Sequence, residues 1–116
     1  MPEILHAVEA ALFSVIVSGA EAPVSCHNTS ATVSDCGARG VVSLLADGSI
    51  LLPGRIRVDR NNPDVIVFST GVTGRRGATG WISFSNGLTV RREGARWRFA
   101  GGLTCAMTAA DQGGCR

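Results

Sequence analysis

The chain has 116 residues, 45% of them hydrophobic, which suits one domain with a single core and leaves little room for a second. We therefore expect residues 1–116 to form a single globular domain. All 11 basic residues are arginine, and the net charge is only +2. The apolar N-terminal stretch is too short and too polar to span a bilayer, which needs about 20 mostly apolar residues.

The N-terminal segment has the pattern of a helix over about residues 3–18. It contains no glycine or proline, and its apolar residues recur at helical spacing, including the stripe Ile4, Val8, Leu12 and Val15. Gly19 follows where a C-cap is expected, and Pro23 prevents continuation. We expect this helix to pack its stripe against a sheet.

The region from about residue 24 to residue 107 has short β-like runs separated by turn residues, as in a meander or small sandwich. Asp47-Gly48 and Asn86-Gly87 are hairpin dipeptides. The predicted strands are 41–45, 49–52, 55–59, 64–69, 81–84, 88–92 and a last run over 97–103. We expect the strand at 64–69, a continuous apolar run, to be buried on both faces. One helix followed by six or seven strands predicts an α+β fold, with the helix packed on an antiparallel sheet.

Four cysteines occur as two pairs, each separated by nine turn-rich residues. The spacing favours the disulfides Cys26–Cys36 and Cys105–Cys115, although four cysteines allow three pairings. Neither pair has the short C-x2-4-C spacing typical of zinc sites. Persistent disulfides imply an oxidising, extracytoplasmic compartment, and because no signal peptide is visible, we expect an export signal to have been removed.

Catalytic and cofactor sites are not indicated by any motif. Nucleophilic catalysis needs a base, usually histidine, beside the nucleophile, and the two histidines, His6 and His27, lie on separate elements. The segment 71–80 lacks the ending of a phosphate-binding P-loop. We expect no enzyme activity, no cofactor and no metal.

Positive charge is segregated along the chain. Residues 39–98 hold ten arginines against four acids, a local net charge of +6. We place Arg75 and Arg76 in a glycine-rich loop, Arg91 and Arg92 at a strand end, and Arg96 and Arg98 at the start of the next. Clustered arginines can contact phosphates, so these six are candidate DNA contacts, and the alternative is that they only solubilise turns and strand edges.

The order of these elements resembles the minor type IV pilins and type II secretion pseudopilins of the FimT, FimU and GspH kind. The resemblance covers about residues 4–103 and includes the small-residue segment before Cys26, the nearby Cys36, and the run 65–71, which is similar to the family's V-x-F-x-x-x-G strand and turn. The prepilin cleavage site, the apolar first half of the helix and the Gly-Arg-x-Arg ending of DNA-binding members are absent.

The resemblance implies a structural subunit of a pilus or secretion filament, with other pilins as partners. It also implies that the chain begins after the membrane half of the helix, with Met1 added, and that the missing half anchors it in the inner membrane. One alternative is a DNA-binding subunit of a DNA-uptake pilus that holds DNA weakly and without sequence preference. A second is an unrelated secreted binding domain stapled by two disulfides.

Overall fold

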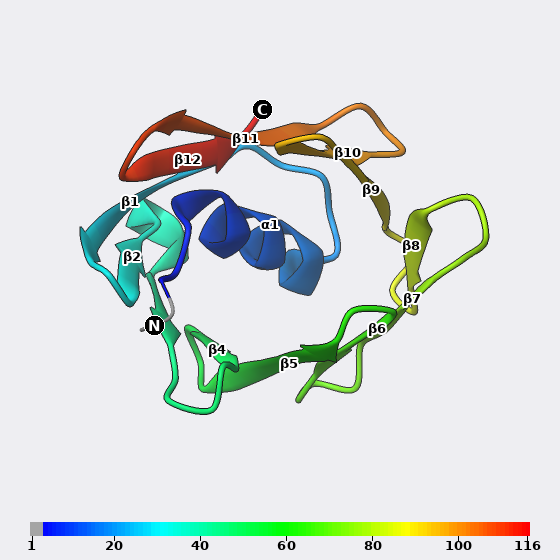
Figure 1. The fold of residues 1–116 in the computed structure, drawn as a ribbon, viewed down its shortest axis with the longest axis horizontal. Helices are drawn as coiled ribbons and strands as arrows, with labels where there is room; N and C mark the ends of the chain where they lie inside the picture. The colour runs from blue at the N-terminus through cyan, green and yellow to red at the C-terminus, as the bar shows by residue number, and fades with distance from the viewer. Residues whose placement is uncertain (1–3) are drawn as a thin grey trace.

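Residues 4–116, which the computed structural model describes, form a closed barrel of twelve antiparallel strands around one α-helix (Figure 1). The strands follow the chain order around the barrel, and the last pairs with the first. In chain order the elements are α1 (Ala7–Ser18), β1 (Val24–Ser30), β2 (Val33–Asp35), the 3-10 helix η1 (Gly37–Arg39), β3 (Val41–Leu44), β4 (Ile50–Leu52), β5 (Ile56–Asn62), β6 (Val65–Phe68), β7 (Thr73–Arg76), β8 (Trp81–Phe84), β9 (Thr89–Glu93), β10 (Arg96–Phe99), β11 (Thr104–Ala109) and β12 (Gln112–Cys115).

The predicted α+β fold, a helix packed on a sheet of six or seven strands, is wrong. The additional strands include β7, placed in a glycine-rich loop, and β12, placed in a glycine-rich tail. Their sequences, Thr-Gly-Arg-Arg and Gln-Gly-Gly-Cys, have no apolar alternation. Such segments join a sheet through backbone hydrogen bonds to neighbouring strands. The hydrophobic pattern within one segment does not show whether those neighbours are present.

The resemblance to the pilin family is contradicted by this architecture. A pilin packs its helix on one face of a sheet, whereas here the strands close around the helix. The motifs on which the resemblance rests are present in the sequence, but they belong to a closed barrel. Met1, which we expected to be an addition, lies outside the described residues. So does residue 3, where the predicted helix begins.

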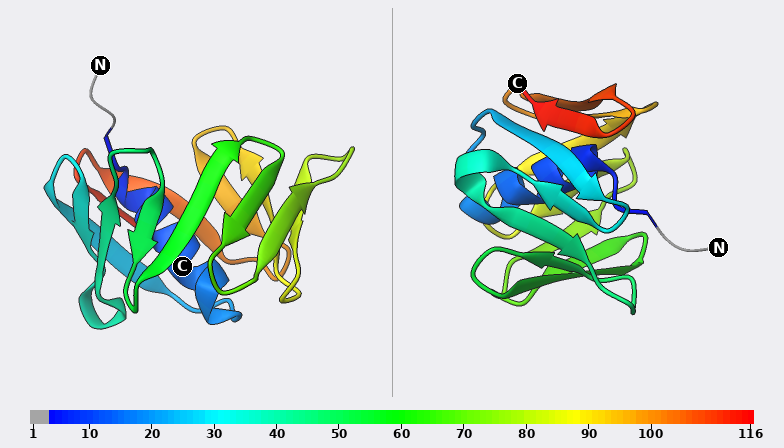
Figure 2. Two further views of the ribbon diagram at one scale, coloured as in Figure 1. Left: turned by 90° about the horizontal axis from the view of Figure 1, so that it is seen from below. Right: turned by 90° about the vertical axis from the view of Figure 1, so that its left-hand side faces the viewer.

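The helix α1 fills the interior of the barrel (Figure 2). Residues 7, 8 and 10–16 are all buried, so α1 is covered on every side rather than along one stripe. A helix that is apolar all round must be buried all round. Ile4, a member of the predicted stripe, precedes α1 and is 54% exposed. The predicted C-cap is confirmed, since Gly19 has a left-handed φ of 77° and its N–H binds the carbonyl of Ile16.

The barrel wall alternates between inward and outward side chains. On β6 the inner residues Ile66 and Phe68 are buried while Val67 is 41% exposed. The expectation of a strand buried on both faces is therefore wrong, because only the inner face of a barrel wall meets the core. Phe68 makes edge-to-face contacts with Phe13 of α1 and with Phe84 of β8.

The two disulfides flank the seam at which the barrel closes. Antiparallel pairing of β1 with β12 joins Val24 to Cys115 in register. The bond Cys26–Cys36 ties β1 to the end of β2, and Cys105–Cys115 ties β11 to β12. The predicted pairing is confirmed, and two such bonds indicate an oxidising, extracytoplasmic compartment.

Candidate functional site

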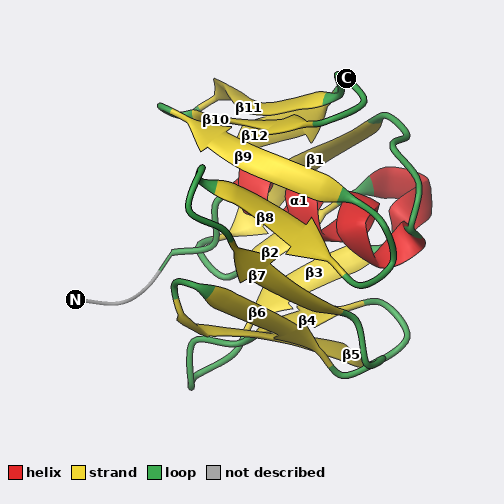
Figure 3. Cartoon of the chain, turned by 90° about the vertical axis from the view of Figure 1, so that its right-hand side faces the viewer, coloured by secondary structure: helices red, strands yellow, loops and turns green. Residues whose placement is uncertain are grey.

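Four of the six candidate arginines lie on the outer surface of β7–β10, the wall that Figure 3 shows in front of α1. Because side chains alternate, Arg75, Arg91, Arg96 and Arg98 point outward, on the face opposite to buried residues of the same strands such as Val90 and Phe99. We call these four arginines the arginine face. Figure 3 shows that β7–β10 lie side by side, as the strand pairing requires.

The centre of the arginine face is a row across three strands. Arg91 of β9 stands opposite Trp81 of β8 on one side and opposite Arg98 of β10 on the other. Its guanidinium carbon lies 4.8 Å from the centre of the Trp81 ring, a cation–π contact. The face therefore has cations side by side next to a partly exposed aromatic ring.

Among residues 4–116, Glu93 is the one acid in register with these cations. Its carboxylate accepts a hydrogen bond of 2.5 Å from Arg91 and stands opposite Arg96. The bond from Arg91, followed by the charges of Arg98 and Arg96, holds the pKa of Glu93 below its usual range. Glu93 therefore stays ionised and neutralises only part of the face.

Arg76 and Arg92 point the other way, toward one mouth of the barrel. Arg92 stands opposite Trp97, with its guanidinium carbon 5.7 Å from the ring centre, and its Nε donates to the carbonyl of Gly94 at 3.1 Å. Arg76 forms an ion pair with Asp64 at 2.5 Å. The structure thus divides the six arginines into two groups, and Arg75 and Arg76, expected in a loop, lie on β7 with opposite orientations.

A cavity of about 460 Å³ opens at this mouth. Its wall includes Arg76, Arg91 and Arg92 together with Trp97, and its floor is formed by apolar side chains of α1 and of the barrel. Trp97 points inward while Arg96 and Arg98 point outward, as alternation along β10 requires. We call this space the mouth cavity.

Two residues of the mouth cavity, Arg60 and Glu9, were not among the sequence-based candidates. Arg60 of β5 forms an ion pair with Glu9 of α1, which anchors the start of the helix to the wall. The predicted strand ended at Asp59, whereas β5 continues to Asn62 through a bulge. Had the alternation of Ile56 and Val58 been continued by two residues, it would have placed Arg60 on the inner face.

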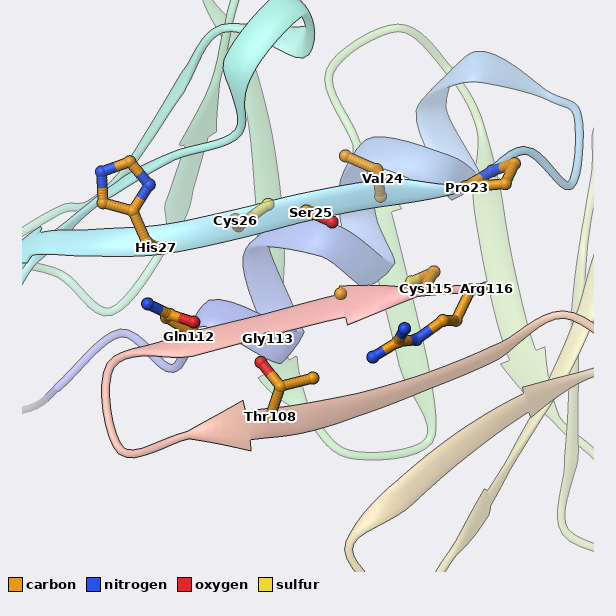
Figure 4. Close-up of a pocket in the computed structure, with 11 residues that line it drawn as sticks. Pro23, Val24, Ser25, Cys26, His27, Thr108, Gln112, Gly113, Cys115 and Arg116 are labelled. Atoms are coloured by element: carbon orange, nitrogen blue, oxygen red, sulfur yellow. The ribbon is translucent and has the colours of Figure 1, made fainter.

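A second hollow, of about 660 Å³, lies over β1, β11 and β12 (Figure 4). Ser25 and His27 project from β1 there, and Gln112 stands opposite His27. No acid lines this hollow, and within residues 4–116 no hydrogen bond joins Ser25 to His27. This hollow therefore supplies no serine held by a base, and the absence of an enzyme activity stays a prediction.

No group of three or more potential metal ligands occurs among residues 4–116. In the same part of the chain, no helix has the length and apolarity to cross a membrane. Comparison with protein-family models, with curated proteins and with solved structures finds no match.

Proposed function

We propose that this protein is an extracytoplasmic, disulfide-stapled binding domain whose arginine face holds the phosphate backbone of DNA, weakly and without sequence preference. The observation that carries the proposal is the segregation of charge. Residues 64–99 hold six arginines against two acids, Asp64 and Glu93, in a chain of net charge +2. Arginine guanidinium groups bind phosphates through paired N–H donors, and this electrostatic contact does not depend on base sequence.

The cross-strand position of two cations supports a role in binding. Arg91 and Arg98 stand directly opposite each other, an arrangement that costs stability in an antiparallel pair. Arg91 is compensated by Glu93 and Trp81, but within the described residues Arg98 forms no ion pair. A polyanion laid along the face would remove this repulsion.

The proposal is tested by titrating duplex DNA at salt concentrations from 50 to 200 mM and following the binding by fluorescence anisotropy. If Arg75, Arg96 and Arg98 each contact a phosphate, the log–log salt slope is about −2.7, and affinity falls about forty-fold over this range. Replacing Arg98 with Gln should remove one contact and reduce the slope to about −1.8.

Arg55→Gln is the matched control, because it removes one positive charge from the turn before β5, outside the arginine face. It should leave the slope near −2.7. Equal effects of the two substitutions would mean that DNA responds only to net charge, which would contradict the proposed face. Binding to dextran sulfate but not to DNA would replace DNA with a sulfated polysaccharide as the partner.

A further inference from the structure

The mouth cavity shares only Arg91 with the arginine face and has the dimensions of a small-molecule site. Its volume of about 460 Å³ lies within the range of about 300–1,000 Å³ that ligand pockets occupy. Such pockets are mainly apolar and contain a few convergent polar groups that fix the orientation of the ligand.

The floor of the mouth cavity is part of the hydrophobic core. Leu12 and Phe13 of α1 and Ile66 and Ile82 of the barrel are buried, yet all four line the cavity. The partly exposed ring of Trp97 forms one side wall. A hydrocarbon or aromatic group placed here would exchange water for apolar surface.

The charges around the mouth cavity leave one cation without an acid. Three of the four arginines that line the cavity have an acidic partner. Arg76 pairs with Asp64, Arg91 with Glu93, and Arg60 with Glu9. Among residues 4–116, Arg92 has no carboxylate partner, and its hydrogen bond to the carbonyl of Gly94 uses only Nε. The charge that complements this site is a single negative one.

We propose that the mouth cavity binds a small amphipathic monoanion, a carboxylate with an apolar body. Arg92 takes the carboxylate at the rim, and the body lies on Phe13, Ile82 and Trp97. Trp97 holds the guanidinium of Arg92 in place through their stacking, so that this cation is positioned before the ligand arrives. This inference goes beyond the proposed DNA contact and uses different residues.

Octanoate is the probe, titrated into the disulfide-bonded protein and followed by two-dimensional ¹H–¹⁵N NMR. Octanoate should shift the indole N–H of Trp97 and the amides of β9 and β10 in a saturable way. Acetate, which lacks the apolar body, and octylammonium, which has the opposite charge, should not. Octanol should bind about tenfold more weakly than octanoate, because a hydrogen bond to a charged acceptor is stronger than one to a neutral hydroxyl.

Arg92→Gln should reduce the affinity for octanoate about tenfold, to the level of octanol. Arg92 is exposed, so the fold should tolerate this change. Thr79→Trp, at the exposed rim, should fill the cavity and abolish the shifts by a second route. Equal affinities for octanoate and octanol, or an unchanged affinity in Arg92→Gln, would overturn the proposal.

Arg75→Gln separates this site from the DNA contact. Arg75 belongs to the arginine face and does not line the mouth cavity, so its substitution should weaken DNA binding and leave octanoate affinity unchanged. Thr79→Trp should have the opposite pattern. A negative result for DNA binding would therefore leave the octanoate test intact, and a negative result for octanoate would leave the DNA test intact.

Discussion

Glu93 sets the charge of the arginine face. Its carboxylate binds Arg91 and lies within the electrostatic reach of Arg96 and Arg98. Because these cations lower its pKa in the folded state, Glu93 contributes stability that is present above its unfolded pKa. That contribution is lost as the pH falls through the folded pKa.

Replacing Glu93 with Gln should strengthen DNA binding and weaken the fold at neutral pH. The substitution frees Arg91 for a phosphate, so the log–log salt slope should steepen by about 0.9. The difference in thermal stability between wild type and variant should shrink as the pH falls through the folded pKa of Glu93, because wild type then also carries a neutral side chain. Weaker DNA binding by the variant would show that the carboxylate orients Arg91 rather than masks it.

At the level of elements, α1 and β12 approach so closely that the strand has no room for a side chain at Gly113. A Cβ added at Gly113 would lie 2.7 Å from the backbone nitrogen of Val8 and 3.1 Å from the carbonyl carbon of Ala7. The obstacle is helix backbone, which cannot rotate away as a side chain can. Gly113 therefore belongs to the packing of the helix against the wall, whereas a Cβ at Gly114 would lie 2.6 Å from the carbonyl oxygen of Val24 in β1.

Gly113→Ala should destabilise the protein by roughly 1–3 kcal/mol, the usual cost of overpacking a core. Chemical denaturation followed by tryptophan fluorescence measures the loss. Gly77→Ala is the matched control, because a Cβ there meets nothing closer than 3.7 Å and the backbone needs no positive φ. A neutral result at Gly113 would mean that α1 lies further from β12 than described.

In the whole molecule, contacts between distant parts of the chain hold the barrel closed. The pairing of β1 with β12 joins segments about 90 residues apart, and the Glu21 carboxylate receives the N–H groups of Gly101 and Leu103. Closing such long loops is entropically costly, so the seam depends on well-formed edges. The two disulfides secure the hairpins on either side of it.

Replacing Cys105 and Cys115 together with Ala should lower stability by about 2.7 kcal/mol in the chain-entropy model for a loop of about ten residues. Hydrogen exchange should show the greatest loss of protection in β11, β12 and β1, while β5–β8 keep theirs. Uniform loss across the barrel would show instead that the seam and the rest of the wall open as one cooperative unit.

Local features of this protein could be predicted from its sequence alone. The end of α1 at Gly19, the two nearby disulfides and the strands around Asp47-Gly48 and Asn86-Gly87 are confirmed. Each depends on residues within about ten positions of one another, where backbone preference and chain entropy act directly. The segregation of the arginines was equally visible.

Only the tertiary structure decided the rest. Strands such as β7 and β12 lack an apolar pattern and exist because neighbouring strands supply hydrogen-bond partners, and closure depends on Val24 meeting Cys115. The same closure encloses α1. A helix that is apolar on all sides could equally be buried between a sheet and a second layer, so its sequence does not specify a barrel. It also turns Arg92 inward and Arg98 outward, because the face on which a side chain lies is fixed by strand register. Register is a property of paired strands, and no single segment of the sequence contains it.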